Sequence, residues 1–172
     1  VNTLNKFIKD ITDYSRNNRL EITRERIRVH ELANEIWEAL KYTPEAQVIT
    51  FKNEIPEDLI IQSDTRRIHV ILSNLISNAI RYHDLRKEEP YIRLQHHAVN
   101  TSHSFSVEDN GQGIAPEIQK RVFDMFYRGN ESSQGSGLGL YIVKETTSKL
   151  AGSIHLNSHP RKGSTFTFTV PA

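Results

Sequence analysis

The segment from Asp64 to about Tyr82 places the strongest constraint on what this 172-residue chain can fold into. At about 100° per residue, its apolar residues gather on one half of a helix, for which Asp64 is a suitable N-cap. These apolar residues are Ile68, Ile71, Leu72, Leu75, Ile76, Ala79 and Ile80. A helix with so wide an apolar face needs a second layer of structure to cover it.

The rest of the chain predicts a sheet as that second layer. Further helices are expected over 1–18, 30–42 and 137–151, with one helical turn after Pro116 in the loop 110–136. Strands are expected over 21–28, 48–51, 59–61, 91–99, 102–109, 152–158 and 163–171. Strands and helices do not alternate regularly, which argues against a doubly wound fold. The predicted class is α+β: a two-layer α/β sandwich whose mixed, mostly antiparallel sheet carries three helices on one face.

Composition excludes several classes of function. The chain is 37% hydrophobic and 25% charged, a composition typical of one soluble globular domain. Its formal net charge is only +1, so it lacks the excess of basic residues that a nucleic-acid-binding protein usually has. It contains no cysteine, which excludes disulfides and thiol chemistry. No apolar stretch approaches the roughly 20 residues that span a bilayer.

The face of the 64–82 helix opposite its apolar half carries Asn74, Asn78 and Arg81, at i, i+4 and i+7. Such a face is usually only solvated. Asn is a mediocre helix former, however, and an exposed face is usually filled with Glu, Lys or Gln. An Asn carbonyl oxygen suits Mg²⁺, and a neighbouring Arg can hold a phosphate, so a binding role is an equally good interpretation.

Two of three downstream segments allow both a structural and a functional interpretation. In "VEDNGQGI", Asp-Asn-Gly is a common turn signal, but Asp109 could also be a buried carboxylate that accepts from an exocyclic amine. In "VFDMFYRG", Phe123 and Phe126 could form a small apolar cluster or anchor a loop that brings Arg128 to a phosphate. The third segment, "GSGLGL", leads into a helix, where backbone N–H groups face an anion. It matches neither the dinucleotide fingerprint nor the Walker loop.

The order of these segments resembles the catalytic, ATP-binding domain of sensor histidine kinases, within the gyrase, heat-shock chaperone, histidine kinase and MutL ATPase superfamily. "NLISNAIRY" resembles the N box of that family, "DNGQGI" and "GSGLGL" its two glycine boxes, and "VFDMFYRG" its phenylalanine box. "GSTFTFTVP" resembles its terminal strand. The resemblance covers roughly residues 25–172 and implies the Bergerat-type ATP-binding fold.

The resemblance also implies roles for individual residues. Asn78 would hold Mg²⁺ and Asn74 would support it, with Arg81 where the family more often has Lys; these three are the expected catalytic residues. Asp109 would select adenine. The remaining expected ATP-binding residues are Tyr82, Gly111, Gly113, Ile114, Phe126, Arg128, Gly135, Ser136, Gly137, Leu138, Gly139 and Leu140. The ATP lid would span about 115–136.

One position separates kinases from ATPases in this superfamily. The ATPase relatives have a Glu one turn before the Mg²⁺-binding Asn, and here that residue is Asn74, which cannot act as a general base. The expected chemistry is transfer of the ATP γ-phosphate to a histidine imidazole. "HELANE" at His30 is rejected as the acceptor, because it lacks the family's proline and lies too close to the N box. The acceptor is therefore expected outside this chain.

The resemblance predicts the organisation of a larger protein. Residues 1–20 would be the end of a dimerisation helix, and 21–172 the catalytic domain, of a cytoplasmic or membrane-anchored two-component sensor kinase. Expected partners are ATP, the dimerisation and phosphotransfer domain of a homodimer, and a cognate response regulator, with no nucleic acid. Two alternatives are a serine-directed anti-sigma-type kinase and a nucleotide-free docking or dimerisation module.

Overall fold

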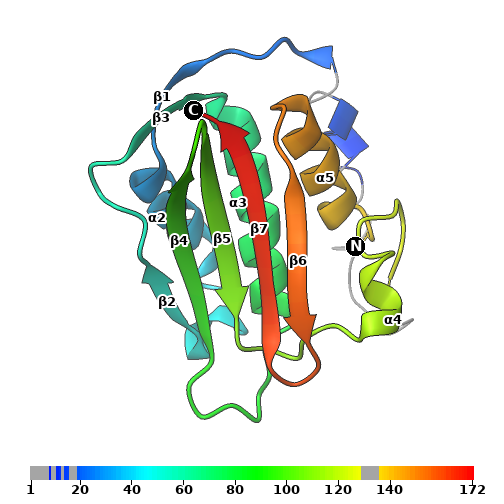
Figure 1. Ribbon diagram of the computed structural model, residues 1–172. Helices are drawn as coiled ribbons and strands as arrows, with labels where there is room; N and C mark the ends of the chain where they lie inside the picture. The colour runs from blue at the N-terminus through cyan, green and yellow to red at the C-terminus, as the bar shows by residue number, and fades with distance from the viewer. Residues whose placement is uncertain (1–7, 9–10, 13, 16–18, 129–135) are drawn as a thin grey trace.

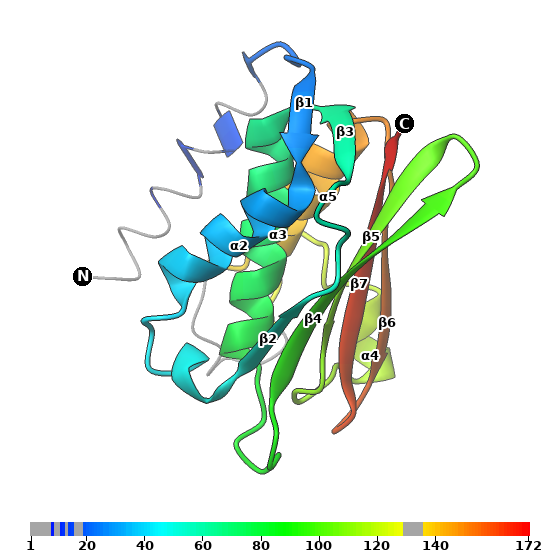
Figure 2. The same cartoon turned by 90° about the vertical axis from the view of Figure 1, so that its left-hand side faces the viewer.

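The computed structural model describes residues 8, 11–12, 14–15, 19–128 and 136–172. Helices α2 (Val29–Leu40), α3 (Thr65–Arg81) and α5 (Gly139–Lys149) lie together on one face of a five-stranded sheet (Figures 1 and 2). The predicted two-layer α/β sandwich with three helices on one face is therefore confirmed.

The large sheet is mixed but mostly antiparallel, as predicted. Its strand order is β2-β4-β5-β7-β6, and only the β2–β4 pair is parallel. The strands are β2 (Thr50–Asn53), β4 (Tyr91–Val99), β5 (Ser102–Asp109), β6 (Ile154–His159) and β7 (Gly163–Pro171). In β7, Phe166, Phe168 and Val170 are buried under the helices, while the threonines between them are half-buried. This period of two is the burial pattern of a sheet with one covered face.

Two predicted strands form a separate ribbon. β1 (Glu25–Arg28) pairs antiparallel with β3 (Ile60–Ser63), so the strand expected over 21–28 is four residues shorter at its start. The strand expected from Val48 begins only at Thr50. A single 3₁₀ turn (Ala46–Val48) precedes it, closed by the Ile49 amide donating to the Ala46 carbonyl at 3.1 Å.

α3 forms the centre of the core. Its N-cap is Asp64, whose side chain accepts from the Arg67 amide at 3.0 Å. All seven apolar residues predicted for its inner face are at most 6% exposed. Burial of each large apolar side chain contributes about 1.5–3 kcal/mol, so this face is the main source of hydrophobic stabilisation along the helix.

The remaining helices differ from expectation at their ends. The loop after β5 contains the short helix α4 (Pro116–Gln119), and α5 begins at Gly139 rather than at residue 137. Most of the helix expected over 1–18 lies outside the described residues. Among the described residues of this region is Tyr14, whose hydroxyl oxygen lies 3.3 Å from the hydroxyl oxygen of Tyr141 in α5. None of the described helices is long and apolar enough to cross a membrane.

Replacement of Ile71 by Ala tests the central position of α3. Ile71 is fully buried, so the variant loses transfer free energy and leaves a cavity. The free energy of unfolding, measured by urea denaturation, is expected to fall by about 2–5 kcal/mol. His69→Ala, on the exposed side of the same helix, should change it by less than about 0.5 kcal/mol. Equal effects of the two variants would contradict this account of the core.

Candidate functional site

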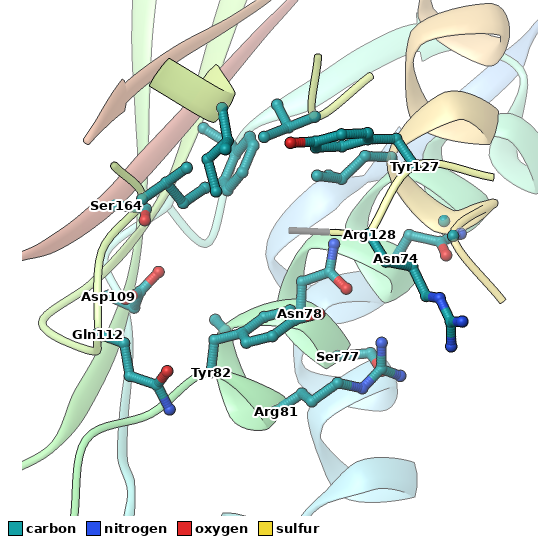
Figure 3. A pocket seen from close by; sticks show the side chains of 18 of the residues that line it. Asn74, Ser77, Asn78, Arg81, Tyr82, Asp109, Gln112, Tyr127, Arg128 and Ser164 are labelled. Atoms are coloured by element: carbon teal, nitrogen blue, oxygen red, sulfur yellow. The ribbon is translucent and has the colours of Figure 1, made fainter. Parts of the chain in front are cut away.

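A pocket of about 180 Å³ opens where α3, the start of α5 and the ends of β5 and β7 meet (Figure 3). It draws its lining from the N box, both glycine-rich segments and the terminal strand, which lie far apart in the sequence. From α3 and its C-cap come Asn74, Ser77, Asn78, Ala79, Arg81 and Tyr82. From the strands come Asp109, Ser164 and Phe166, and from the loops and α5 come Gln112, Gly113, Ile114, Ile118, Val122, Tyr127, Arg128, Ser136, Gly137, Gly139 and Leu140.

The α3 wall is the polar stripe predicted from the sequence. The Asn74 amide nitrogen donates to the Val70 carbonyl at 2.8 Å, one turn back in its own helix. Its Oδ1 faces Gly139, where an added Cβ would lie only 3.0 Å away. Because the nitrogen is already engaged, the Asn74 side chain presents its oxygen toward the start of α5.

Asp109 ends β5, directly opposite Ser164 of β7. It is 9% exposed, and its Oδ1 accepts from the Gly111 amide at 2.8 Å. Burial raises the pKa of Asp109 to about 6, against the lowering effect of hydrogen bonds from the Gly111 and Ser164 amides. The carboxylate is thus held in a fixed position inside the pocket with its charge poorly solvated.

The loop after Asp109 is fastened to the end of α3. The Gln112 amide donates to the Tyr82 carbonyl at 3.0 Å, and its side chain donates to the His83 carbonyl at 3.1 Å. Gly113 has a φ of +69°, and a Cβ there would lie 2.0 Å from the His159 carbonyl oxygen. Gly111, predicted to bind ATP, is not among the residues that line the pocket, but its amide holds Asp109 and a Cβ there would lie 2.4 Å from the Tyr82 carbonyl oxygen.

The two phenylalanines of the phenylalanine box lie in different environments. Phe123 packs edge-on against Phe166 with ring centroids 6.2 Å apart, as an anchor would. Phe126 was expected at the ligand but is 53% exposed and does not line the pocket. Its backbone has a φ of +62° and donates to the Gly137 carbonyl at 3.0 Å, so it turns the chain. Tyr127 lines the pocket in its place, with the Arg121 guanidinium 4.5 Å from its ring centroid.

The second glycine-rich segment closes the pocket from α5. Gly137, Gly139 and Leu140 line it, while Leu138 is buried in the protein and does not. Gly137 has a φ of +71°, and a Cβ there would lie 2.8 Å from the backbone of Phe126. Gly135 lies outside the described residues.

Charge is distributed unevenly along the pocket. Figure 3 shows Asp109, Gln112 and Ser164 at one end and Asn74, Ser77, Arg81 and Arg128 at the other, with Asn78 between them. Asp109 is the only acidic residue among those that line the pocket. The site therefore offers an anionic acceptor at one end and two cations with amide groups at the other.

Twelve of the sixteen predicted site residues line this pocket: Asn74, Asn78, Arg81, Tyr82, Asp109, Gly113, Ile114, Arg128, Ser136, Gly137, Gly139 and Leu140. Sequence analysis missed Ser77, although it lies three residues after Asn74 and four before Arg81, on the same stripe. It also missed Ser164 and Phe166. These join the site through pairing of β7 with β5, a contact that no local sequence pattern reveals.

The site and the sandwich together define a domain with a small-ligand pocket, cationic at one end, between α3, α5 and the ends of two central strands. The profile of the family described as "Histidine kinase-, DNA gyrase B-, and HSP90-like ATPase" matches residues 63–172. The chain belongs to this family.

Similar proteins narrow the family to one branch. The chain is 37% identical over 128 residues to the sensor-like histidine kinase SenX3 of Mycobacterium tuberculosis, a match covering 72% of this chain and 30% of SenX3. It is 32% identical over 182 residues to the sensor histidine kinase WalK of Bacillus subtilis, covering 98% of this chain and 27% of WalK. The chain thus spans less than a third of the length of each of these two relatives.

Solved structures of histidine kinases have the same fold as this chain. The catalytic domain of histidine kinase ThkA superposes with a TM-score of 0.74 and 28% identity, covering 88% of this chain and 96% of that one. Full-length ShkA superposes with a TM-score of 0.80 and 25% identity, covering 96% of this chain and 35% of that one.

Replacement of Asp109 by Asn tests the poorly solvated charge. The folded-state pKa is raised, so the folded protein binds more protons than the unfolded chain between about pH 4 and pH 6, and the charged form destabilises the fold above that range. At pH 7 the Asn variant is expected to be more stable by about 1–2 kcal/mol in urea denaturation, and the gain should shrink toward pH 4.

The control for this measurement is Asp58→Asn, an exposed carboxylate for which no gain is expected. Loss of stability in the Asp109 variant at pH 7 would show that the charge is well solvated in the folded protein.

Proposed function

We propose that this chain binds Mg·ATP and is the catalytic domain of a two-component sensor histidine kinase, a protein-histidine kinase. The observation that carries the proposal is the uneven charge of the pocket, with Asp109 at one end and Arg81 and Arg128 at the other. ATP has the same asymmetry, because its base presents an amino group and its opposite end carries the phosphates.

The Asp109 end suits adenine. A buried carboxylate that already accepts backbone N–H groups has lone pairs left for the exocyclic amine of adenine. Guanine would present a carbonyl oxygen there and repel the carboxylate. Ile114, Val122 and Phe166 supply apolar surface for a planar ring, while Gly113 lets the loop backbone approach closely.

The opposite end suits a triphosphate with Mg²⁺. Arg81 and Arg128 supply positive charge, and the first turn of α5 adds backbone N–H groups at a helix N-terminus. The Asn78 amide oxygen is a hard ligand of the kind Mg²⁺ accepts. The described residues contain no cluster of three or more His, Asp or Glu that could hold an ion alone. Asn78 would therefore hold Mg²⁺ together with phosphate oxygens and water, and the ion would neutralise phosphate charge.

The pocket favours transfer over hydrolysis. A water-attacking ATPase needs a general base near the γ-phosphate. Among the lining residues the only carboxylate is Asp109, at the adenine end, and no histidine lines the pocket. Asn74 occupies the position of the ATPase glutamate, and its side-chain nitrogen donates a hydrogen bond to the Val70 carbonyl oxygen. Positioning by Asn74 and Asn78 and charge neutralisation by Arg81 are then the chain's contribution to phosphoryl transfer.

The acceptor would be a histidine on a dimerisation domain outside this chain. Among the histidines here, His30 has Nδ1 2.6 Å from the Ile55 carbonyl oxygen, as in a structural role. Residues 1–20 would be the end of a dimerisation helix, and 21–172 the catalytic domain, of a homodimeric kinase that acts in the cytoplasm.

Two solved neighbours support these partners. The ShkA structure is a complex with AMPPNP, and ThkA has been solved in complex with the response regulator protein TrrA. By analogy, this chain would take part in a phosphorelay to its own response regulator.

Calorimetric titration with Mg·ADP and Mg·GDP tests the nucleotide site. The chain is expected to bind ADP and to bind GDP at least about tenfold more weakly, because one misplaced polar group costs 1–3 kcal/mol. Asp109→Ala should abolish measurable ADP binding. Ser102→Ala, at the far end of the same strand, should leave it unchanged. Absence of ADP binding by the parent chain would instead favour a docking module.

Incubation with γ-labelled ATP tests the location of the acceptor. The 172-residue chain alone is expected to incorporate no label, because its site faces no histidine of its own. Label appearing on any histidine of this chain would contradict an external acceptor. Label on a serine of an added partner would favour the anti-sigma-type alternative.

A further inference from the structure

The Asp64–Arg67 pair at the start of α3 is buried more deeply than its role as a helix cap requires. Arg67 is 2% exposed and Asp64 is 5% exposed. Their side chains form an ion pair with each other, and Asp64 also caps the helix through the Arg67 amide at 3.0 Å. An N-cap alone needs only Asp, Asn, Ser or Thr at the first of these positions, so the buried guanidinium needs a separate explanation.

The guanidinium of Arg67 reaches the segment that precedes β1. Its Nη2 donates to the Leu20 carbonyl at 2.7 Å, and its Nη1 lies 3.4 Å from the Glu21 carbonyl. The Thr23 amide in turn donates to Asp64 Oδ2 at 3.1 Å. The two side chains thus fasten Leu20–Thr23 to a helix more than 40 residues further along the sequence.

The helix that receives this segment is also the wall of the nucleotide pocket. Asn74, Asn78 and Arg81 lie on α3 at most about 21 Å from Arg67, at 1.5 Å per residue along one rigid helix. The second helix at the pocket, α5, meets the N-terminal residues through Tyr141, whose hydroxyl lies 3.3 Å from that of Tyr14. The two long helices that line the pocket, α3 and α5, therefore both contact the N-terminal part of the chain.

We propose that Arg67, with Asp64, is a positioning residue that fastens the segment Leu20–Thr23 to α3, so that the segment through which the N-terminal residues join the domain keeps a fixed position relative to the phosphate-binding side chains. This inference rests on the proposed function, because the position of this segment matters for transfer only if the acceptor histidine belongs to the dimerisation domain that precedes it. Arg67 touches no substrate in this arrangement. Its effect is to present the γ-phosphate to an acceptor in the correct geometry, where small misplacements cost large factors in rate.

Arg67→Lys separates positioning from charge compensation. Lys still pairs with Asp64, but its single ammonium cannot also reproduce the planar fork that reaches the Leu20 and Glu21 carbonyls. The matched control is Arg66→Gln, an exposed neighbour in the same helical turn. In the 172-residue chain, tryptic cleavage after Arg19 and hydrogen exchange of the Thr23 amide should both be about tenfold faster in the Lys variant. Its ADP affinity should stay within about twofold of the parent, which shows that α3 and the pocket are intact.

The second readout is phosphorylation in the kinase that contains the acceptor histidine. Arg67→Lys should lower kcat about tenfold or more with an unchanged KM for ATP, whereas Arg66→Gln should change neither. A Lys variant that matches the control in cleavage, exchange and kcat overturns the inference. If the parent kinase incorporates no phosphate, the proposed function fails, while the cleavage and exchange measurements still decide whether Arg67 holds the segment.

Should Arg67→Lys lower ADP affinity by unfolding the helix start, the double variant Asp64→Asn with Arg67→Met replaces it. Asn retains the N-cap, and no buried charge is left unpaired. This variant is expected to bind ADP as the parent does and to be cleaved faster after Arg19. Slow cleavage after Arg19 in this variant overturns the inference, because the segment would then be held without the guanidinium.

Discussion

The two-sided character of α3 is the constraint on which the rest of the structure depends. One side is fully apolar and must be covered, which places the helix against the sheet, with α2 on one side of it and α5 on the other. The opposite side is then fixed in direction, so Asn74, Asn78 and Arg81 all point into one pocket. A single helix therefore joins stability to ligand binding, because any shift that improves its packing also moves the side chains proposed to hold phosphate.

Asp109 illustrates the opposite relation between stability and function. Burial raises its pKa to about 6, which means that the folded protein bears a free-energy cost for keeping the carboxylate charged near neutral pH. A ligand with an N–H donor relieves part of that cost when it binds, whereas water is largely excluded. The destabilising charge and the proposed selectivity for adenine are thus two results of the same burial.

The sequence predicted most of the architecture because the decisive signals are local. The period of the apolar residues identified α3 and β7, and Asp64 gave the helix start. The structure differs from expectation where distant contacts decide the outcome. Phe126, expected at the ligand, is exposed on a turn with positive φ, and Gly111 holds Asp109 through its amide at a place where a Cβ would lie 2.4 Å from the Tyr82 carbonyl oxygen. Ser164 and Phe166 reach the site only through strand pairing. Arg67 gave no local signal of its contact with Leu20.

The hydrogen bond from Phe126 to Gly137 has a consequence for how this domain can vary. It joins a residue within the phenylalanine box to the residue two positions before the start of α5, and the backbone has positive φ at both residues, which fixes the directions in which the chain leaves and returns. The entropy of closing that loop is already lost in the folded protein. Each doubling of loop length adds only about 0.6 kcal/mol. Residues inserted between Arg128 and Ser136 would therefore change this closure cost little, and the pocket residues on either side of them could keep their positions.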